Sequence, residues 1–187
     1  VYDRFGLVNE RSLLAHAVHL SRNEWNLIAD RRATVVHCPG ANIFLRSGLF
    51  NYRAAYEREV RVALGSDVAA GPDIAMPRVA RAMIEVAKVR RMAEPANTPM
   101  PKNALVPRPA DVWRIITEVN AAAIGVAGGG RLAPGAPADV LVLQPPWLDD
   151  EHLIGRLIYD WRDDLIRERI VAGQRLDPAL FSPARPT

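Results

Sequence analysis

Three short apolar segments, each followed by a helical pattern, limit most strongly what this chain can fold into. The apolar segments are residues 13–18, 34–37 and 60–66. The helical patterns cover residues 22–32, which Ser21 and Glu24 cap, and then residues 52–59 and 74–92. Strands that alternate with helices in this order are typical of parallel βα units, so the sequence predicts an α/β fold with a parallel sheet.

The second half of the chain predicts a change of architecture. Residues 93–109 are rich in proline and lack periodicity, so we expect a loop there. Residues 110–126 have the pattern of a helix that the glycines at 128–130 must end.

Beyond these glycines, the sequence predicts a small β layer. The expected elements are strands at residues 138–143 and 166–172, a turn at Gly173, and a helix at residues 151–159. We therefore expect two parts: residues 1–127, and residues 128–187 as a small β domain and tail.

Composition excludes several classes of protein. Hydrophobic residues make up 49% and charged residues 24%, as in an ordinary soluble globular protein. No apolar run approaches the roughly eighteen residues of a membrane helix, and the first residues lack the pattern of a secretory signal, which predicts a cytoplasmic protein without membrane contact. The 24 Lys and Arg residues are spread among 21 acidic ones, with no basic block, which argues against nucleic-acid binding.

Three ionisable residues lie where the predicted strands end, namely His16, His37 and Asp67. The carboxyl ends of the strands form the active-site face of a parallel α/β barrel, so these residues are candidates for catalysis or metal binding. One such histidine alone is more often a hydrogen-bonded core residue, but three in succession favour a site. Histidine and aspartate are ligands that zinc uses, although the chain has no HxH or HExxH pair.

The residues around these positions carry a family resemblance. Three stretches resemble the barrel-strand motifs of metal-dependent amidohydrolases, in the aminohydrolase and chlorohydrolase branch: LLAHAVHLS, VVHCPGANIFLRSGLF and VRVALGSDVAAG. Two more resemble the guanine deaminase family: MPRVARAMIEVAKVRRM and GRLIYDWRDDLIRERIVAGQRL. A further stretch, GRLAPGAPADVLVL, is similar to the superfamily's junction between barrel and small β domain. The resemblance covers residues 13–176 and implies the C-terminal part of a (β/α)8 TIM barrel, followed by the C-terminal part of a small β-sandwich domain.

The resemblance also implies roles for individual residues. Asp67 matches a metal ligand that also takes a proton from the metal-bound water, and His16 matches a catalytic histidine that orients this water without binding the metal. His37 and Asn42 match residues that line the substrate pocket. The implied metal is Zn²⁺, with Fe as an alternative, the implied substrate is the purine guanine, and members of the family form homodimers.

Part of the family's machinery has no match in this sequence. The HxH metal pair is missing, as are a later histidine ligand and a proton-shuttling glutamate, so Asp67 is one of four expected ligands. A (β/α)8 barrel takes about 250 residues, whereas 187 residues here hold both a barrel part and a β layer. We therefore expect a C-terminal fragment that is inactive without the N-terminal half.

Two alternatives stay open at this point. Another aminohydrolase or chlorohydrolase, acting on an adenosine-type or triazine ring, would share most of the quoted motifs. A non-catalytic remnant that associates with itself through bare strand edges would also fit, because open edges of a sheet pair readily.

Overall fold

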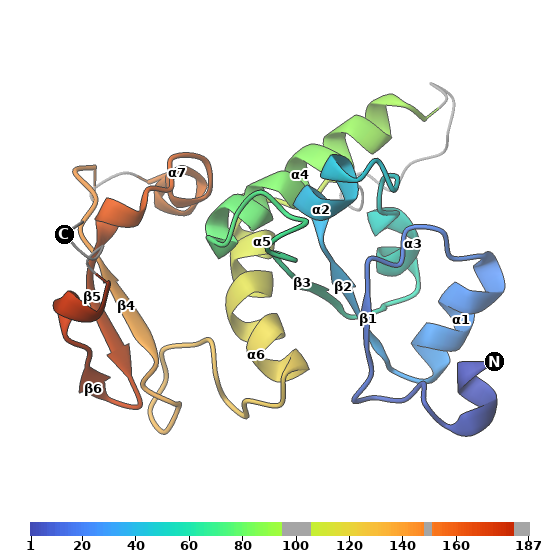
Figure 1. The fold of residues 1–187 in the computed structure, drawn as a ribbon, viewed down its shortest axis with the longest axis horizontal. Coiled ribbons are helices and arrows are strands. Elements are labelled where there is room, and N and C mark those ends of the chain that lie inside the picture. The colour runs from blue at the N-terminus through green and yellow to red at the C-terminus, as the bar shows by residue number, and fades with distance from the viewer. Residues whose placement is uncertain (95–105, 148–150, 182–187) are drawn as a thin grey trace, which may run out of the picture.

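The computed structural model of the chain describes residues 1–94, 106–147 and 151–181. Its first half is built on a parallel sheet of three strands in the order β1-β2-β3 (Figure 1). These strands are β1 (Leu13–Ala15), β2 (Thr34–His37) and β3 (Val62–Leu64). Both pairs run parallel, so the predicted α/β fold with a parallel sheet is confirmed.

Helices connect these strands and lie around the sheet (Figure 1). They are α1 (Arg22–Asp30), α2 (Pro39–Phe44), α3 (Tyr52–Glu57) and α4 (Met76–Met92), after a short 3-10 turn at Tyr2–Phe5. The predicted capping box of α1 is confirmed, since the Ser21 and Glu24 side chains each bond the other residue's backbone N–H. This pair satisfies two donors that the first turn of a helix otherwise leaves free.

Two expectations for these elements were wrong. The residues Cys38-Pro39-Gly40 predict that the second strand runs into a loop, but this segment forms α2, because Pro39 occupies the first turn, where its missing N–H costs nothing. The first strand was expected to reach Val18 but ends at Ala15, because His16 and Ala17 take positive φ angles of 66° and 50°.

A second long helical segment lies against β3. It consists of α5 (Pro109–Arg114), a π-helical turn (Ile115–Val119) and α6 (Asn120–Ala123), and it stops short of the predicted end at residue 126. The side-chain amide of Asn120 accepts from Leu64 N and donates to Leu64 O, both at 2.9 Å. These two bonds join the helix to the outer edge of β3, three residues before Asp67.

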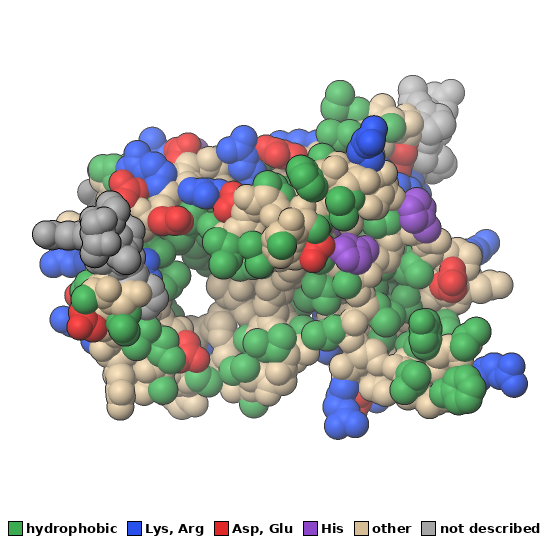
Figure 2. All heavy atoms as spheres, in the orientation of Figure 1, with side chains coloured by type: hydrophobic (Ala, Val, Ile, Leu, Met, Phe, Trp, Pro, Cys, Tyr) green, Lys and Arg blue, Asp and Glu red, His purple; other side chains and the backbone are tan. Residues whose placement is uncertain are grey.

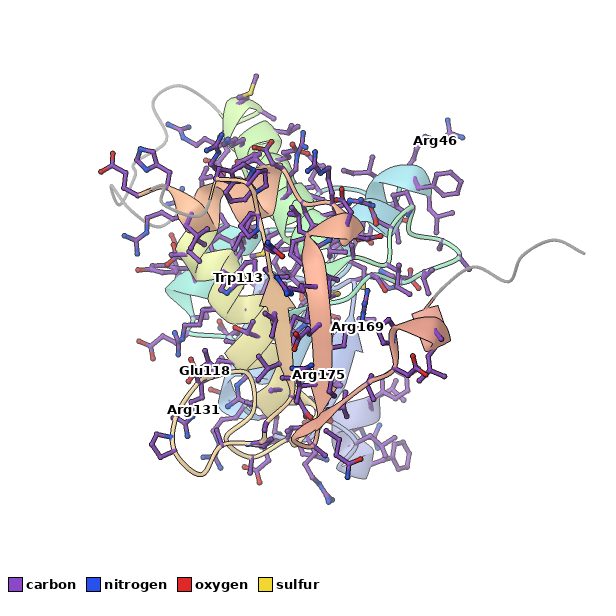
Figure 3. All side chains as sticks on the ribbon, turned by 90° about the vertical axis from the view of Figure 1, so that its left-hand side faces the viewer. Arg46, Trp113, Glu118, Arg131, Arg169 and Arg175 are labelled. Atoms are coloured by element: carbon purple, nitrogen blue, oxygen red, sulfur yellow. The ribbon has the colours of Figure 1, made fainter. Side chains whose placement is uncertain are left out.

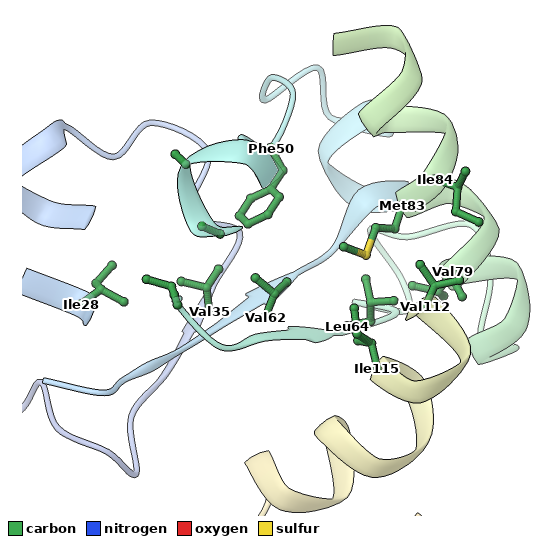
Figure 4. Close-up of a cluster of buried hydrophobic side chains, with 14 of the residues drawn as sticks. Ile28, Val35, Phe50, Val62, Leu64, Val79, Met83, Ile84, Val112 and Ile115 are labelled. Atoms are coloured by element: carbon green, nitrogen blue, oxygen red, sulfur yellow. The ribbon is translucent and has the colours of Figure 1, made fainter. Parts of the chain in front are cut away.

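The main hydrophobic core lies between the parallel sheet and the helices (Figure 4). Its buried members include Trp25, Ile28, Val35, Phe50, Val62, Leu64, Val79, Met83, Ile84, Val112 and Ile115. The position of Trp25 in a helical pattern predicts a core residue, and this is confirmed, since Trp25 is 3% exposed and packs edge-on against Phe50.

The C-terminal part contains an antiparallel sheet in the order β4-β5-β6. Its strands are β4 (Val140–Leu143), β5 (Ile166–Val171) and β6 (Gln174–Arg175), with α7 (Leu153–Tyr159) and the 3-10 turns Asp163–Leu165 and Pro178–Phe181 beside them. The predicted turn at Gly173 is confirmed, with positive φ at both Ala172 and Gly173, as a type I′ hairpin requires.

A smaller core joins this part to the helices. Figure 3 looks onto the antiparallel sheet, with the helical segment that carries Trp113 and Glu118 beside it. Trp113 packs against both the main core and a second cluster formed by Leu157, Trp161 and Leu165. The prolines at 95, 99 and 101 of the predicted loop lie outside the described residues. Among the helices that the structure describes, none has the length and apolar character to cross a membrane.

Candidate active site

His16 stands directly beyond the carboxyl end of β1. Its backbone N–H donates to Val36 O at 2.8 Å, which extends the ladder by one bond before the chain turns. The positive φ of His16 and Ala17 then directs the chain away from the strand. Residues held in this sparsely populated region cluster at functional sites, and the sharp turn leaves the His16 side chain 44% exposed.

Asp67 stands in a tight turn after β3. Its φ is 47° and that of Ala69 is 95°, both in the left-handed region. The turn closes through a bond from Gly71 N to Asp67 O and an isolated bridge between Val68 and Gly71. The Asp67 side chain is 37% exposed, so its carboxylate can reach a ligand.

The structure brings His16, Asn42 and Asp67 together at the carboxyl ends of the strands. The His16 ring lies between the other two: its Nδ1 is 2.9 Å from Asn42 Oδ1, and its Nε2 is 3.9 Å from Asp67 Oδ2. Figure 2 shows a histidine and an acidic side chain side by side near α2 on this face. The arrangement offers an oriented imidazole and a carboxylate within reach of one small molecule, which is what general acid–base chemistry needs.

Asn42 is placed by α2, the helix that the sequence pattern missed. Its side chain is 3% exposed and bonds to His16, 26 residues earlier in the chain. The sequence identified Asn42 only through the family motif. A signal for α2 itself was available, because proline at the first helical position is a known start of a helix.

His37 does not join this cluster. Its side chain is 1% exposed and stacks on Phe50 with ring centroids 4.4 Å apart. Neither ring nitrogen has a hydrogen-bond partner among the described residues. Burial, with a smaller contribution from the charge of His16, lowers the pKa of His37 to about 3, so the ring is neutral at ordinary pH.

Two neighbouring residues have structural surroundings. His19 matches no functional position in the family motif, which predicts a structural or surface role. Its side chain is exposed, and its Nε2 lies 2.7 Å from Ser47 O. Cys38 is 4% exposed, and burial raises the pKa of its thiol. A protonated, buried thiol packs like a small apolar side chain and is a poor metal ligand.

The described residues do not form a complete metal centre. No group of three or more His, Cys, Asp or Glu side chains is placed to hold a metal ion in the part of the chain that the structure describes. A catalytic zinc site takes about three protein ligands and an open position. The exposed carboxylate of Asp67 has the chemistry of one such ligand.

Substituting Gly71 by alanine is expected to disrupt the turn that carries Asp67. An added Cβ would lie 2.0 Å from Ser66 O, a backbone atom that cannot move without changing the turn. We expect a loss of about 1–3 kcal/mol in the free energy of unfolding, measured by urea denaturation. Gly155→Ala is the matched control: it meets nothing within 4 Å in a helix and is expected to stabilise by about 0.5–1 kcal/mol. Equal effects of the two substitutions would contradict this account of the turn.

Comparisons with known proteins agree with this geometry. The model of the amidohydrolase family matches residues 1–176. The chain is 28% identical to the guanine deaminase of Mus musculus over 193 residues, which cover 95% of this chain and 41% of that protein. The chain therefore spans less than half the length of this relative.

Two solved structures share the fold. The guanine deaminase from C. acetobutylicum, with guanine bound in its active site, superposes with a TM-score of 0.83 at 28% identity, over 94% of this chain and 42% of that one. An adenosine deaminase from Xanthomonas campestris with bound zinc gives a TM-score of 0.80 at 28% identity, over 95% of this chain and 42% of that one. From the family match across residues 1–176 and this shared fold, we conclude that the chain belongs to the amidohydrolase family.

Proposed function

We propose that the chain supplies one side of the active site of an aminohydrolase that converts guanine and water to xanthine and ammonia. The observation that carries this proposal is the pairing of His16, in the turn after β1, with Asp67, in the turn after β3, where Nε2 and Oδ2 are 3.9 Å apart. The similarity to guanine deaminases, one of them with guanine bound, supports guanine as the substrate.

In this proposal each residue handles a proton at a stated atom. The Asp67 carboxylate accepts one proton from the attacking water, and His16 Nε2 accepts a hydrogen bond from the same water and orients it towards the ring carbon that bears the amino group. Asp67 is the residue of this chain that would hold Zn²⁺ or Fe, and such a metal, when bound, lowers the pKa of water towards neutrality. Asp67 then returns the proton to the amino nitrogen, which leaves as ammonia, and the ring becomes flat again.

The remaining parts of the chain have supporting roles in the proposal. Asn42 borders the site from α2, whereas the buried His37 packs on Phe50 and supports the site from the core. Residues 1–127 form the end of the barrel, and residues 128–187, with the sheet β4-β5-β6, form part of a small β-sandwich. The complete protein would be a cytoplasmic homodimer.

A panel of ring substrates tests the choice of guanine. Ammonia release is measured with guanine, adenosine and an aminotriazine, using the chain alone and the chain joined to the part of the mouse guanine deaminase that it does not match. We expect release from guanine by the joined protein and none by the chain alone. Preferred release from adenosine would instead favour the second candidate, which the zinc-containing adenosine deaminase supports.

A further inference from the structure

We propose that Asn42 is a positioning residue that fixes the tautomer of His16, with the proton on Nδ1 and a free lone pair on Nε2. The catalytic meaning of this inference rests on the proposed function, but the tautomer itself does not. In this account Asn42 acts through His16, not by touching the substrate.

The contact between the two side chains determines where the proton lies. His16 Nδ1 and Asn42 Oδ1 are 2.9 Å apart, a normal hydrogen-bond distance. An amide oxygen can only accept, so the imidazole nitrogen that faces it must carry the hydrogen. A neutral ring has one N–H, and its Nε2 is then an acceptor.

Asn42 is held in place before any ligand binds. Its backbone N–H donates to Cys38 O at 3.0 Å, and its backbone C=O accepts from Ser47 N at 2.8 Å. The side chain is 3% exposed, and its amide Nδ2 has no hydrogen-bond partner among the described residues. The backbone bonds place the amide beside His16, and the bond from Nδ1 to Oδ1 is the contact that orients both side chains.

The other side of the ring shows why this choice matters. Nε2 faces Asp67 Oδ2 at 3.9 Å, too far for a direct hydrogen bond. With Nδ1 protonated, both atoms are acceptors across a shared gap. Such a pair suits a species that has hydrogens to donate to both, such as water or the amino group of a purine.

The chain contains an internal reference for the opposite tautomer. His19 Nε2 lies 2.7 Å from the backbone oxygen of Ser47, which can only accept. A neutral His19 must therefore carry its proton on Nε2. Nε2–H is also the intrinsically favoured tautomer of a histidine side chain in water. Of these two histidines, His16 is therefore the one that needs a neighbouring acceptor to reverse it.

Nitrogen NMR of the ¹⁵N-labelled, metal-free chain tests the inference. Long-range ¹H–¹⁵N spectra are recorded about two pH units above the ordinary histidine pKa of about 6.5, where exposed rings are neutral. We expect the Nδ1 shift of a protonated nitrogen for His16 and the reverse pattern for His19, with the signals assigned by His16→Gln and His19→Gln. An Nε2–H pattern for His16 in the unmodified chain would overturn the inference.

Two substitutions of Asn42 sharpen the test. Asn42→Leu removes the acceptor at similar volume, and we expect the ¹⁵N pattern of His16 to move towards the Nε2–H tautomer while His19 is unchanged. Asn42→Ala is the second variant if the leucine variant does not fold. An unchanged His16 pattern in a folded variant would also overturn the inference. Because no substrate or metal is present, a confirmed tautomer without deamination would count against the proposed function alone.

Discussion

Lowering the pH from about 7 to about 4 is expected to reduce the free energy of unfolding by about 3 kcal/mol through His37 alone. The unfolded chain binds a proton on this histidine below a pH of about 6.5. The folded chain binds it only near the lowered pKa of about 3, because the ring is buried against Phe50. The unfolded state thus holds more protons between these values, so stability is present above about pH 6.5 and is lost as the pH falls towards 3.

Urea denaturation at a series of pH values measures this effect. His37→Leu removes the buried imidazole and should flatten the acid slope by about 1.4 kcal/mol per pH unit between about pH 6 and pH 4. His19→Gln, at an exposed histidine, is the matched control, and this variant should keep the pH dependence of the free energy of unfolding that His37 causes. If the free energy of unfolding falls with pH equally steeply in the wild type and in His37→Leu, the His37 ring is not held neutral by burial.

Removing the imidazole of His16 is expected to lower the rate of deamination by about 10²–10⁴-fold, the usual range for a group that handles a proton in the transition state. The change is read as kcat/KM for ammonia release by the joined protein described above. His19→Gln is the control, because His19 bonds a backbone oxygen outside the cluster.

A double substitution tests whether His16 and Asp67 act as a unit. Residues that act as a unit on one water molecule give non-additive losses of rate. The loss in kcat/KM from His16→Ala combined with Asp67→Asn should therefore be little more than the loss from the worse single substitution. Asp30→Asn, at an exposed carboxylate at the end of α1, is the control for loss of a negative charge. Fully multiplicative losses would indicate that the two residues act independently.

Local patterns were enough to predict most elements of the fold. Thr34, Val35 and Val36 are β-branched residues in a row, and β2 has the bounds that this run predicts. The end of β1 was predicted less well, because apolar residues continue beyond Ala15 while the backbone turns at His16. A positive φ angle of this kind does not change the hydrophobic pattern of the sequence, so the pattern cannot predict it.

The sequence predicted only part of the candidate site. The physical reason for success or failure differs between the residues. Strand ends located His16 and Asp67, because the carboxyl ends of parallel strands meet at one edge. The direction of His37 depends on which face of β2 points to the helices, and strand position alone does not specify that face. The bonds of Asn120 to Leu64 join residues 56 apart in sequence, and no local pattern predicts such a contact.

The most direct test of the central claim is ammonia release from guanine by the joined protein, with Asp67→Asn assayed beside it. The account predicts turnover with the aspartate and loss of at least about 10²-fold without it, as expected for a group that handles a proton in the transition state. Turnover of guanine that is equal in the two proteins would contradict the assignment of Asp67 and, with it, the proposed active site.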